Sequence, residues 1–340
     1  MYQDKRKIMI LSITLLAASL LIILLSCYIF VNAVECLGKA CNLHQGIVGS
    51  ILAAIGTALP ETLIPIIAIF FSGGAQAQEV GIGAIAGAPF MLGTLGFFVT
   101  GFAVIVYSAL GKRNKTMNVD CNVISKDLTF FLIIYGTAIA TSFFYEITWL
   151  KTIIAIFLLL SYTIYLKLVV SSEAAMLENV EILYIKKFVK LPDSIPFIVI
   201  QLAVSLVIII TGADLFIKYV QQLSSVIGVS PLILSLIITP IATELPEKLN
   251  SIIWVGRKKE TLAVGNITGA MVFQSCFPVV FGMIFTPWNL HGMTLVSAGL
   301  ALSGAAINLI WIKIFKSLNP YILMTGGLLY GIFIISLFYI

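Results

Sequence analysis

Long apolar stretches fill almost the whole chain, and short charged or glycine- and proline-rich breaks separate them. An apolar run of about 18 or more residues can cross the hydrocarbon core of a bilayer as a helix. The breaks define ten such runs, at residues 8–33, 46–72, 80–108, 127–146, 149–170, 194–221, 231–255, 262–286, 292–315 and 320–339. The pattern therefore predicts an all-α membrane protein with ten transmembrane helices.

The polar segment 171–193 divides the predicted helices into two sets of five. Because five is an odd number, the two sets must enter the membrane from opposite sides. We therefore predict two inverted five-helix repeats, at residues 1–170 and 194–340, joined by a cytoplasmic linker at 171–193.

Lysine and arginine are unevenly distributed between the two ends of the predicted helices. One side collects Lys39, Lys112, Arg113, Lys115, Lys126, Lys167, Lys186, Lys187, Lys190, Arg257, Lys258, Lys259, Lys313 and Lys316. The other side holds only Lys5, Arg6, Lys7, Lys151 and Lys218. Cytoplasmic loops carry the excess of positive charge. We therefore expect a multi-pass protein of the cell membrane with both termini on the extracytoplasmic side, although the basic N-terminal cluster alone favours the opposite orientation.

The composition supports lipid as the main solvent of the chain. Hydrophobic residues make up 60% of the sequence and charged residues 10%, against about 45–50% and about 25% in soluble domains. The net charge of +5 arises from residues between the apolar runs, so it does not indicate nucleic-acid binding. The 5 cysteines follow no zinc or disulfide pattern. We expect no cofactor.

One short motif occurs twice, once in each half. Threonine, one further residue and Leu-Pro-Glu stand inside an apolar stretch at Thr57–Glu61 and again at Thr243–Glu247. A Gly-x-x-x-Gly pair follows on the next predicted helix of each half, at Gly83/Gly87 and Gly265/Gly269. Such repeated tracts are typical of inverted-repeat transporters, whose sites lie near the bilayer midplane where the repeats meet.

The residue types in this motif suit a cation. A carboxylate at the bilayer centre costs about 2.5–3.5 kcal/mol on insertion scales. Such residues are usually kept only where they have a function, so Glu61 and Glu247 are candidate site residues. Proline has no backbone N–H and clashes with the carbonyl four residues earlier. Pro60 and Pro246 therefore free carbonyl oxygens beside the glutamates. Carboxylate, carbonyl and hydroxyl oxygens are the ligands that Ca²⁺ and other hard cations prefer.

A third glutamate, Glu244, precedes Glu247 by three residues, so the two carboxylates share one helix face. Two such carboxylates could bind a divalent cation or share a proton. The alternative is that Glu244 forms an ion pair with Lys248, which follows it by four residues.

At these residues the sequence resembles the Ca²⁺/cation antiporter superfamily, specifically the sodium/calcium exchanger type. GADLFIKYVQQLSSVIGVSPLILSLIITPIATELPE, residues 212–247, resembles that family's second repeat, and GTALPE, residues 56–61, resembles the first. The resemblance covers both repeats. It implies ten helices and the exchange of Ca²⁺ for Na⁺ or H⁺ by alternating access in a monomeric transport unit, with inorganic cations as substrates.

The same resemblance implies a ligand set. Glu61 and Glu247 are the expected central carboxylates, accompanied by Thr57, Ala58, Thr243, Glu244 and Gln274. The family usually has polar ligands on the following helices, but the first repeat has Leu92 at the later position, and the second has Gln274. Glu244 stands where the family usually has serine, and the resemblance implies that it restores the charge lost where Gln274 replaces an acid. These departures leave the coupling ion open.

Three other functions compete with Ca²⁺ antiport. A cation channel could also line its pore with acidic residues, and an exchanger of a different cation pair would use the same oxygen ligands. An intramembrane enzyme would need an acid/base or nucleophile set, and the sequence offers neither a Ser/His/Asp set nor a histidine cluster. We expect no enzymatic activity.

Overall fold

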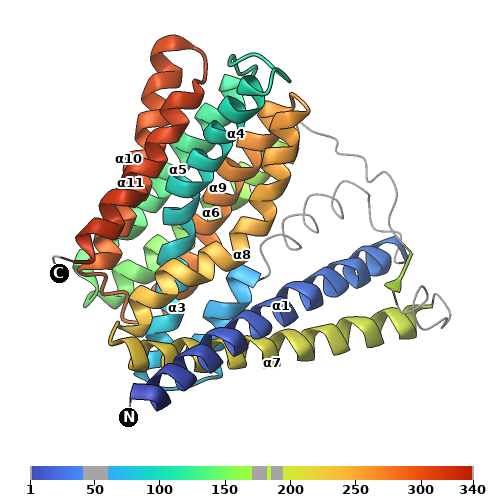
Figure 1. Ribbon diagram of the computed structural model, residues 1–340, viewed down its shortest axis with the longest axis vertical. Helices are drawn as coiled ribbons and strands as arrows, with labels where there is room; N and C mark the ends of the chain where they lie inside the picture. The colour runs from blue at the N-terminus through green and yellow to red at the C-terminus, as the bar shows by residue number, and fades with distance from the viewer. Residues whose placement is uncertain (1, 41–59, 171–181, 185–193, 339–340) are drawn as a thin grey trace. The chain divides into compact units, whose positions relative to one another are not determined.

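The computed structural model describes residues 2–40, 60–170, 182–184 and 194–338 (Figure 1). All regular elements in these residues are helices. They are α1 (Tyr2–Ala40), α3 (Ala75–Met91), the π-helix η1 (Leu92–Gly96), α4 (Phe97–Ala109), α5 (Cys121–Thr141), the 3₁₀-helix η2 (Ser142–Phe144), α6 (Thr148–Val170), α7 (Ile195–Ile227), α8 (Pro231–Gly256), α9 (Glu260–Phe285), α10 (Met293–Phe315) and α11 (Pro320–Ser336). A further helix covers Pro60–Phe70.

Seven helices in the described residues are long and apolar enough to cross a membrane. They are Lys5–Val34, Ala75–Ala109, Cys121–Phe144, Thr148–Lys167, Ile195–Ile227, Glu260–Phe285 and Met293–Phe315. Shorter apolar helices are Pro60–Phe70, Pro231–Glu244 and Pro320–Ser336. The prediction of an all-α membrane protein is thus confirmed. The count of ten crossings and the inversion of the two halves stay predictions.

The start of α5 shows how a polar residue moves a helix boundary away from the apolar pattern. The fourth span was expected from residue 127, but α5 begins at Cys121 because Asp120 caps it. The Asp120 carboxylate accepts hydrogen bonds from the backbone N–H groups of Asn122 and Val123. These N–H groups have no partner within the helix, so the cap extends α5 beyond its apolar part.

The helices form two compact units, one of residues 1–80 and 163–231 and the other of residues 81–162 and 232–340. We call them unit 1 and unit 2. Each unit takes helices from both predicted repeats, so the units and the repeats divide the chain differently. Unit 1 holds the first helix of each predicted repeat, α1 and α7.

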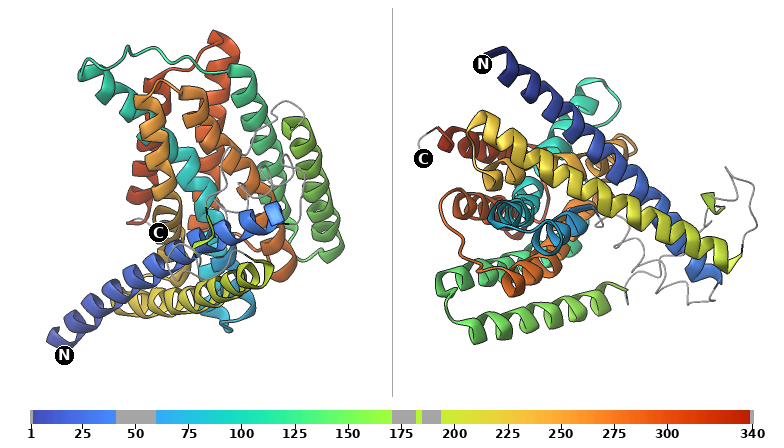
Figure 2. Two further views of the ribbon diagram at one scale, coloured as in Figure 1. Left: turned by 90° about the vertical axis from the view of Figure 1, so that its right-hand side faces the viewer. Right: turned by 90° about the horizontal axis from the view of Figure 1, so that it is seen from below.

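Unit 1 is built on the long antiparallel pair of α1, with 39 residues, and α7, with 33 (Figures 1 and 2). Gly212 of α7 lies directly against α1. A methyl group added at Gly212 would come within 3.0 Å of the Ile23 side chain. The missing side chain therefore allows the two helices to approach closely.

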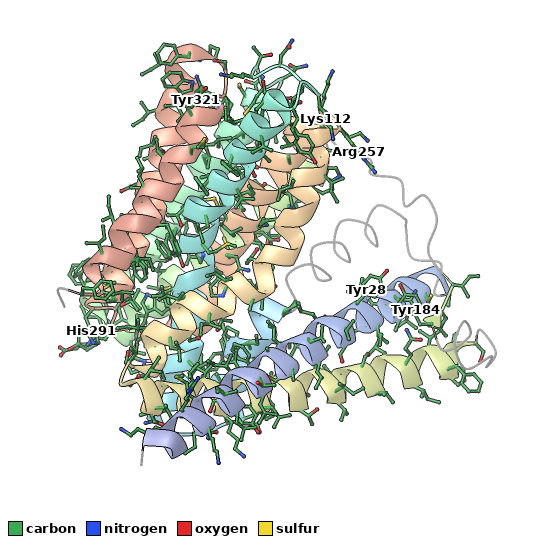
Figure 3. The ribbon with its side chains drawn as sticks, viewed as in Figure 1. Tyr28, Lys112, Tyr184, Arg257, His291 and Tyr321 are labelled. Atoms are coloured by element: carbon green, nitrogen blue, oxygen red, sulfur yellow. The ribbon has the colours of Figure 1, made fainter. Side chains whose placement is uncertain are left out.

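Polar contacts attach residues 182–184 to this pair. The Asn32 side-chain oxygen accepts hydrogen bonds from the Tyr184 backbone N–H, at 3.0 Å, and from the Gln201 amide, at 3.0 Å. Leu183 is fully buried among Ala33, Cys36 and Ile198, and the Tyr184 ring stacks on Tyr28 (Figure 3). This part of the predicted linker therefore belongs to the core of unit 1.

Replacing Asn32 by alanine is expected to loosen this attachment. The change removes the acceptor of the Tyr184 N–H, and a hydrogen bond contributes about 1 kcal/mol net. Hydrogen exchange of the Tyr184 amide should accelerate about fivefold, while amides in α10 keep their rates. Hydrogen–deuterium exchange with mass spectrometry measures both regions in one experiment. Unchanged exchange at Tyr184 would contradict the described contact.

In unit 2, α3 lies against the first half of α8 through two glycines. A methyl group at Gly83 would clash with the Leu232 carbonyl oxygen, and one at Gly87 with the Leu236 carbonyl oxygen. Pro240 provides no N–H for the Leu236 carbonyl, so this oxygen is free for the close approach. Around Gly265 and Gly269, by contrast, the described residues leave space. In the described residues, the Gly-x-x-x-Gly spacing thus serves close helix packing at Gly83 and Gly87.

Replacing Gly87 by alanine is expected to destabilise the protein by at least about 2 kcal/mol, because the added methyl meets rigid backbone and Pro240 Cγ at 2.7 Å. The matched control is Gly136→Ala in α5, where an added methyl meets no atom of the described residues within 4 Å. Thermal unfolding in detergent should separate the two variants. Equal melting temperatures would contradict the packing of α3 on α8.

A buried ion pair joins the loops at one end of unit 2. An Arg113 guanidinium nitrogen lies 2.6 Å from the Glu260 carboxylate, and the same side chain donates to the carbonyls of Val255 and Thr116. Lys112 and Arg257 lie at this end, and His291 lies at the other (Figure 3). Basic residues expected on the cytoplasmic side thus gather at one end of unit 2, while the orientation in the membrane stays a prediction.

Candidate functional site

Glu61 is placed by the Pro60–Phe70 helix of unit 1. Its side chain is only 4% exposed, and Ile64 and Ile67 on the same helix are buried with it. An ionisable group at such a position is a functional candidate by default, because burial penalises its charged form. Thr57 and Ala58, predicted as its neighbours in the site, lie outside the described residues.

The second predicted Pro-Glu tract lies in the middle of α8, where the helix bends (Figure 1). Pro240 and Pro246 each remove one backbone hydrogen bond, which is an established cause of such bends. The apolar first part of α8 ends at Glu244. Glu247 follows within α8, but its side chain lies outside the described part of the structure.

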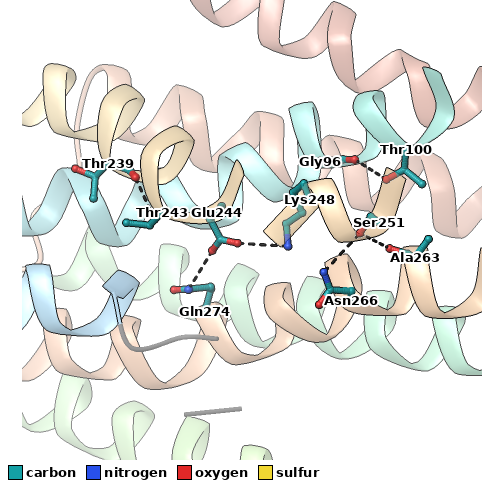
Figure 4. A network of polar contacts seen from close by, with 10 residues as sticks. All are labelled: Gly96, Thr100, Thr239, Thr243, Glu244, Lys248, Ser251, Ala263, Asn266 and Gln274. Carbon is teal, nitrogen blue, oxygen red and sulfur yellow. Dashed lines mark hydrogen bonds and ion pairs between the residues drawn. The ribbon is translucent and has the colours of Figure 1, made fainter. Parts of the chain in front are cut away.

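Glu244 has a partner for each of its carboxylate oxygens (Figure 4). Oε2 lies 3.4 Å from the Lys248 ammonium, one helical turn further along α8. Oε1 accepts a hydrogen bond of 3.3 Å from the side-chain amide of Gln274 on α9. All three side chains are almost completely buried. The structure therefore forms the ion pair that the sequence offered as the alternative to a cation site at Glu244, and it brings Gln274 to the same place.

Hydroxyl groups continue this polar row toward the first part of α8. The Thr243 hydroxyl donates to the Thr239 carbonyl at 3.0 Å (Figure 4), and the hydroxyls of Thr239 and Ser235 lie 2.9 Å apart. Because Thr243 uses its hydrogen for the backbone, its oxygen keeps lone pairs that could bind a cation. Thr243 is buried next to Glu244, as the predicted ligand set requires.

Further polar contacts join α8 to α9 beyond Lys248. The Ser251 hydroxyl donates to the Ala263 carbonyl at 3.1 Å, and the Asn266 amide reaches the Ser251 oxygen at 3.5 Å (Figure 4). Ser251 is fully buried. Glu244 and Ser251 of α8 are therefore both held by residues of α9.

Two features near these helices were not predicted from the sequence. The buried Asp127 of α5 accepts a hydrogen bond of 2.6 Å from Thr268 of α9. Its position among Ile124, Leu128 and Phe131 on one helix face could have revealed it, but the helix was expected to begin at residue 127. The second feature is η1, a single π-helical stretch that begins at Leu92, shortly after Pro89. Such stretches are frequent at functional sites.

The side chains described by the structure do not form a metal cluster by themselves. Among them, no three histidine, cysteine or acidic side chains lie close enough together to hold a metal ion. Cys27, Cys121 and Cys276 carry free thiols. Glu61 belongs to unit 1, whereas Glu244 and Gln274 belong to unit 2. The grouping of Glu61 with Glu247 therefore rests on the repeat in the sequence.

Buried acidic and amide side chains on the apolar helices of a membrane protein are features of a membrane transporter. A family model places the chain within this class, since it matches residues 11–169 and 197–340 and describes the sodium/calcium exchanger protein family. The chain belongs to this family. Its members are exchangers, so the protein is a transporter and not an enzyme.

Individual relatives agree with the family and the fold. The inner membrane protein YrbG of Escherichia coli is 24% identical over 282 residues, which cover 82% of this chain and 81% of YrbG. The H⁺/Ca²⁺ exchanger CAX superposes with a TM-score of 0.69 at 17% identity, over 96% of this chain and 82% of CAX. The sodium-calcium exchanger NCX_Mj gives 0.56 at 20% identity, over 96% and 99%.

Proposed function

We propose that this protein is a secondary cation antiporter that exchanges Ca²⁺ for Na⁺ or H⁺ across the cell membrane by alternating access. The observation that carries the proposal is the burial of Glu61, directly after the first proline of the repeated Leu-Pro-Glu motif. A buried carboxylate beside a freed backbone carbonyl offers hard oxygen ligands to a cation that has shed its water.

The ligands follow from the repeat. Glu61 and Glu247 supply the central charge, the hydroxyls of Thr57 and Thr243 add neutral oxygens, and Gln274 adds an amide oxygen. Ala58 contributes through its backbone carbonyl. The names of the superposed exchangers support Ca²⁺ as the substrate and support both Na⁺ and H⁺ as coupling ions. The unit that transports is a single chain with both termini on the extracytoplasmic side.

Ion flux in proteoliposomes tests this function. The purified full-length protein is reconstituted, and ⁴⁵Ca²⁺ uptake is followed with an outward Na⁺ gradient, with a pH gradient, or with neither. An antiporter takes up Ca²⁺ only when one of the gradients is present, and dissipating that gradient stops uptake. Uptake that is equal with and without gradients would identify a channel instead. No uptake in any condition would exclude Ca²⁺ as the substrate.

A further inference from the structure

The ion pair between Glu244 and Lys248 is unusual for its depth. The side chains are 2% and 0% exposed, and the charged atoms lie 3.4 Å apart within one turn of α8. Burying two charges costs several kcal/mol each, which their attraction repays only with good geometry and further hydrogen bonds. Replacing such a buried pair by apolar residues is often neutral or stabilising, so stability alone does not account for it.

The pair belongs to the second repeat alone. Counting from the shared threonine, Ala58 and Thr62 occupy in the first repeat the places that Glu244 and Lys248 occupy in the second. Neither of these residues carries a charge. The two charged residues therefore occur together in one repeat and are both absent from the other, which indicates that they act as a unit.

The orientation of the Gln274 amide follows from its contact with Glu244. An ionised carboxylate only accepts hydrogen bonds, so the NH₂ group of Gln274 must face Glu244 and its oxygen must face away. Gln274 is 2% exposed. In the described residues its Oε1 accepts no hydrogen bond. A buried acceptor without a donor is costly, and a bound cation would satisfy it.

We propose that Glu244 and Lys248 form a permanent, neutral ion pair that positions Gln274, so that Gln274 Oε1 and not Glu244 contacts the transported cation. This inference rests on the proposed cation exchange and concerns the same site. Both Glu244 oxygens are engaged by Lys248 and Gln274, so neither is required as a cation ligand. The pair then adds no net charge to the site.

Four versions of the full-length protein test the positioning role: wild type, Glu244→Gln, Lys248→Met and the double variant. Ca²⁺ affinity is measured by calorimetry in detergent, and Na⁺ competition is measured in the same samples. Glu244→Gln removes the carboxylate that offsets the charge of the Lys248 ammonium and should weaken Ca²⁺ binding about 100-fold. The double variant keeps the pair's net charge of zero, and its new amide oxygen can still accept from Gln274. It should recover to within about fivefold of wild type.

Lys248→Met alone gives the selectivity readout. It adds one net negative charge, and a divalent cation gains more from that charge than a monovalent one, so Ca²⁺ binding should tighten at least about tenfold relative to Na⁺ binding. Size-exclusion profiles and melting temperatures check that each variant is folded. If the double variant binds Ca²⁺ as weakly as Glu244→Gln, Glu244 is a direct ligand and the positioning role is wrong.

The inference and the proposed function fail in different ways. If the wild-type protein binds Ca²⁺ but does not exchange it, the proposed antiport is wrong. The Ca²⁺ affinities of the four versions still test whether the Glu244–Lys248 pair positions Gln274. Gradient-driven exchange without recovery in the double variant overturns the pair alone. If Mn²⁺ or Na⁺ binds more tightly than Ca²⁺, the affinities of the four versions for that cation are compared instead, and the double variant must again recover for the positioning role to hold.

Discussion

Replacing Glu61 by glutamine is expected to reduce gradient-driven Ca²⁺ uptake about 100-fold or more while the protein stays folded. Glu61 is 4% exposed on an apolar helix, and the neutral amide keeps its size but removes its charge. Losing one partner of a buried charge pair costs about 2–5 kcal/mol, and about 1.4 kcal/mol corresponds to a factor of ten. Initial rates of ⁴⁵Ca²⁺ uptake in proteoliposomes measure the effect.

The matched control is Glu79→Gln in α3, because Glu79 is only partly buried. This variant should retain the wild-type rate within about twofold, since a charge that keeps contact with solvent contributes little. By the symmetry of the repeats, Glu247→Gln should match Glu61→Gln. Wild-type uptake by Glu61→Gln would remove this residue from the site and leave the transport class untouched.

Replacing Arg113 by methionine is expected to cause the largest loss of stability. The change leaves the buried Glu260 carboxylate without its partner at 2.6 Å and removes the hydrogen bonds to the Val255 and Thr116 carbonyls. Breaking a buried pair in this way costs about 3–5 kcal/mol. The melting temperature in detergent should fall on the order of 10 °C.

Two further variants make this prediction specific to the buried pair. Lys112→Met removes the neighbouring charge, which is exposed, and should leave the melting temperature nearly unchanged. Adding Glu260→Gln to Arg113→Met should restore part of the loss, because no unpaired charge then stays buried. A double variant as unstable as Arg113→Met would show that the lost hydrogen bonds, and not the charge, dominate.

The helices were largely predictable, since membrane-length apolar runs have few other solutions than helices. The boundaries were less so. The start of α5 depends on a polar cap at Asp120, which lies outside the apolar pattern. The division into two units could not be read from the sequence, because it depends on which helices pack together and not on their order along the chain.

The candidate site was only partly visible in the sequence. Leu-Pro-Glu repeats marked both helices, and the spacing of Glu244 and Lys248 showed that an ion pair could form. The spacing could not decide between the ion pair and a cation ligand, because that choice depends on the position of Gln274, 30 residues further along the chain. The contact of Asp127 with Thr268 likewise joins residues 141 apart. Such long-range pairings follow from packing and leave no local pattern.

Because α1 and α7 are so long, the free energy of unit 1 depends on how thick the membrane is. At about 1.5 Å per residue, the 39 and 33 residues span about 58 Å and 50 Å. The hydrocarbon core measures only about 30 Å. A helix pair of this length can keep its apolar surface in lipid only by slanting, and the slant depends on lipid chain length. The tilt of α1 and α7 from the membrane normal should therefore differ between bilayers of short-chain and long-chain lipids.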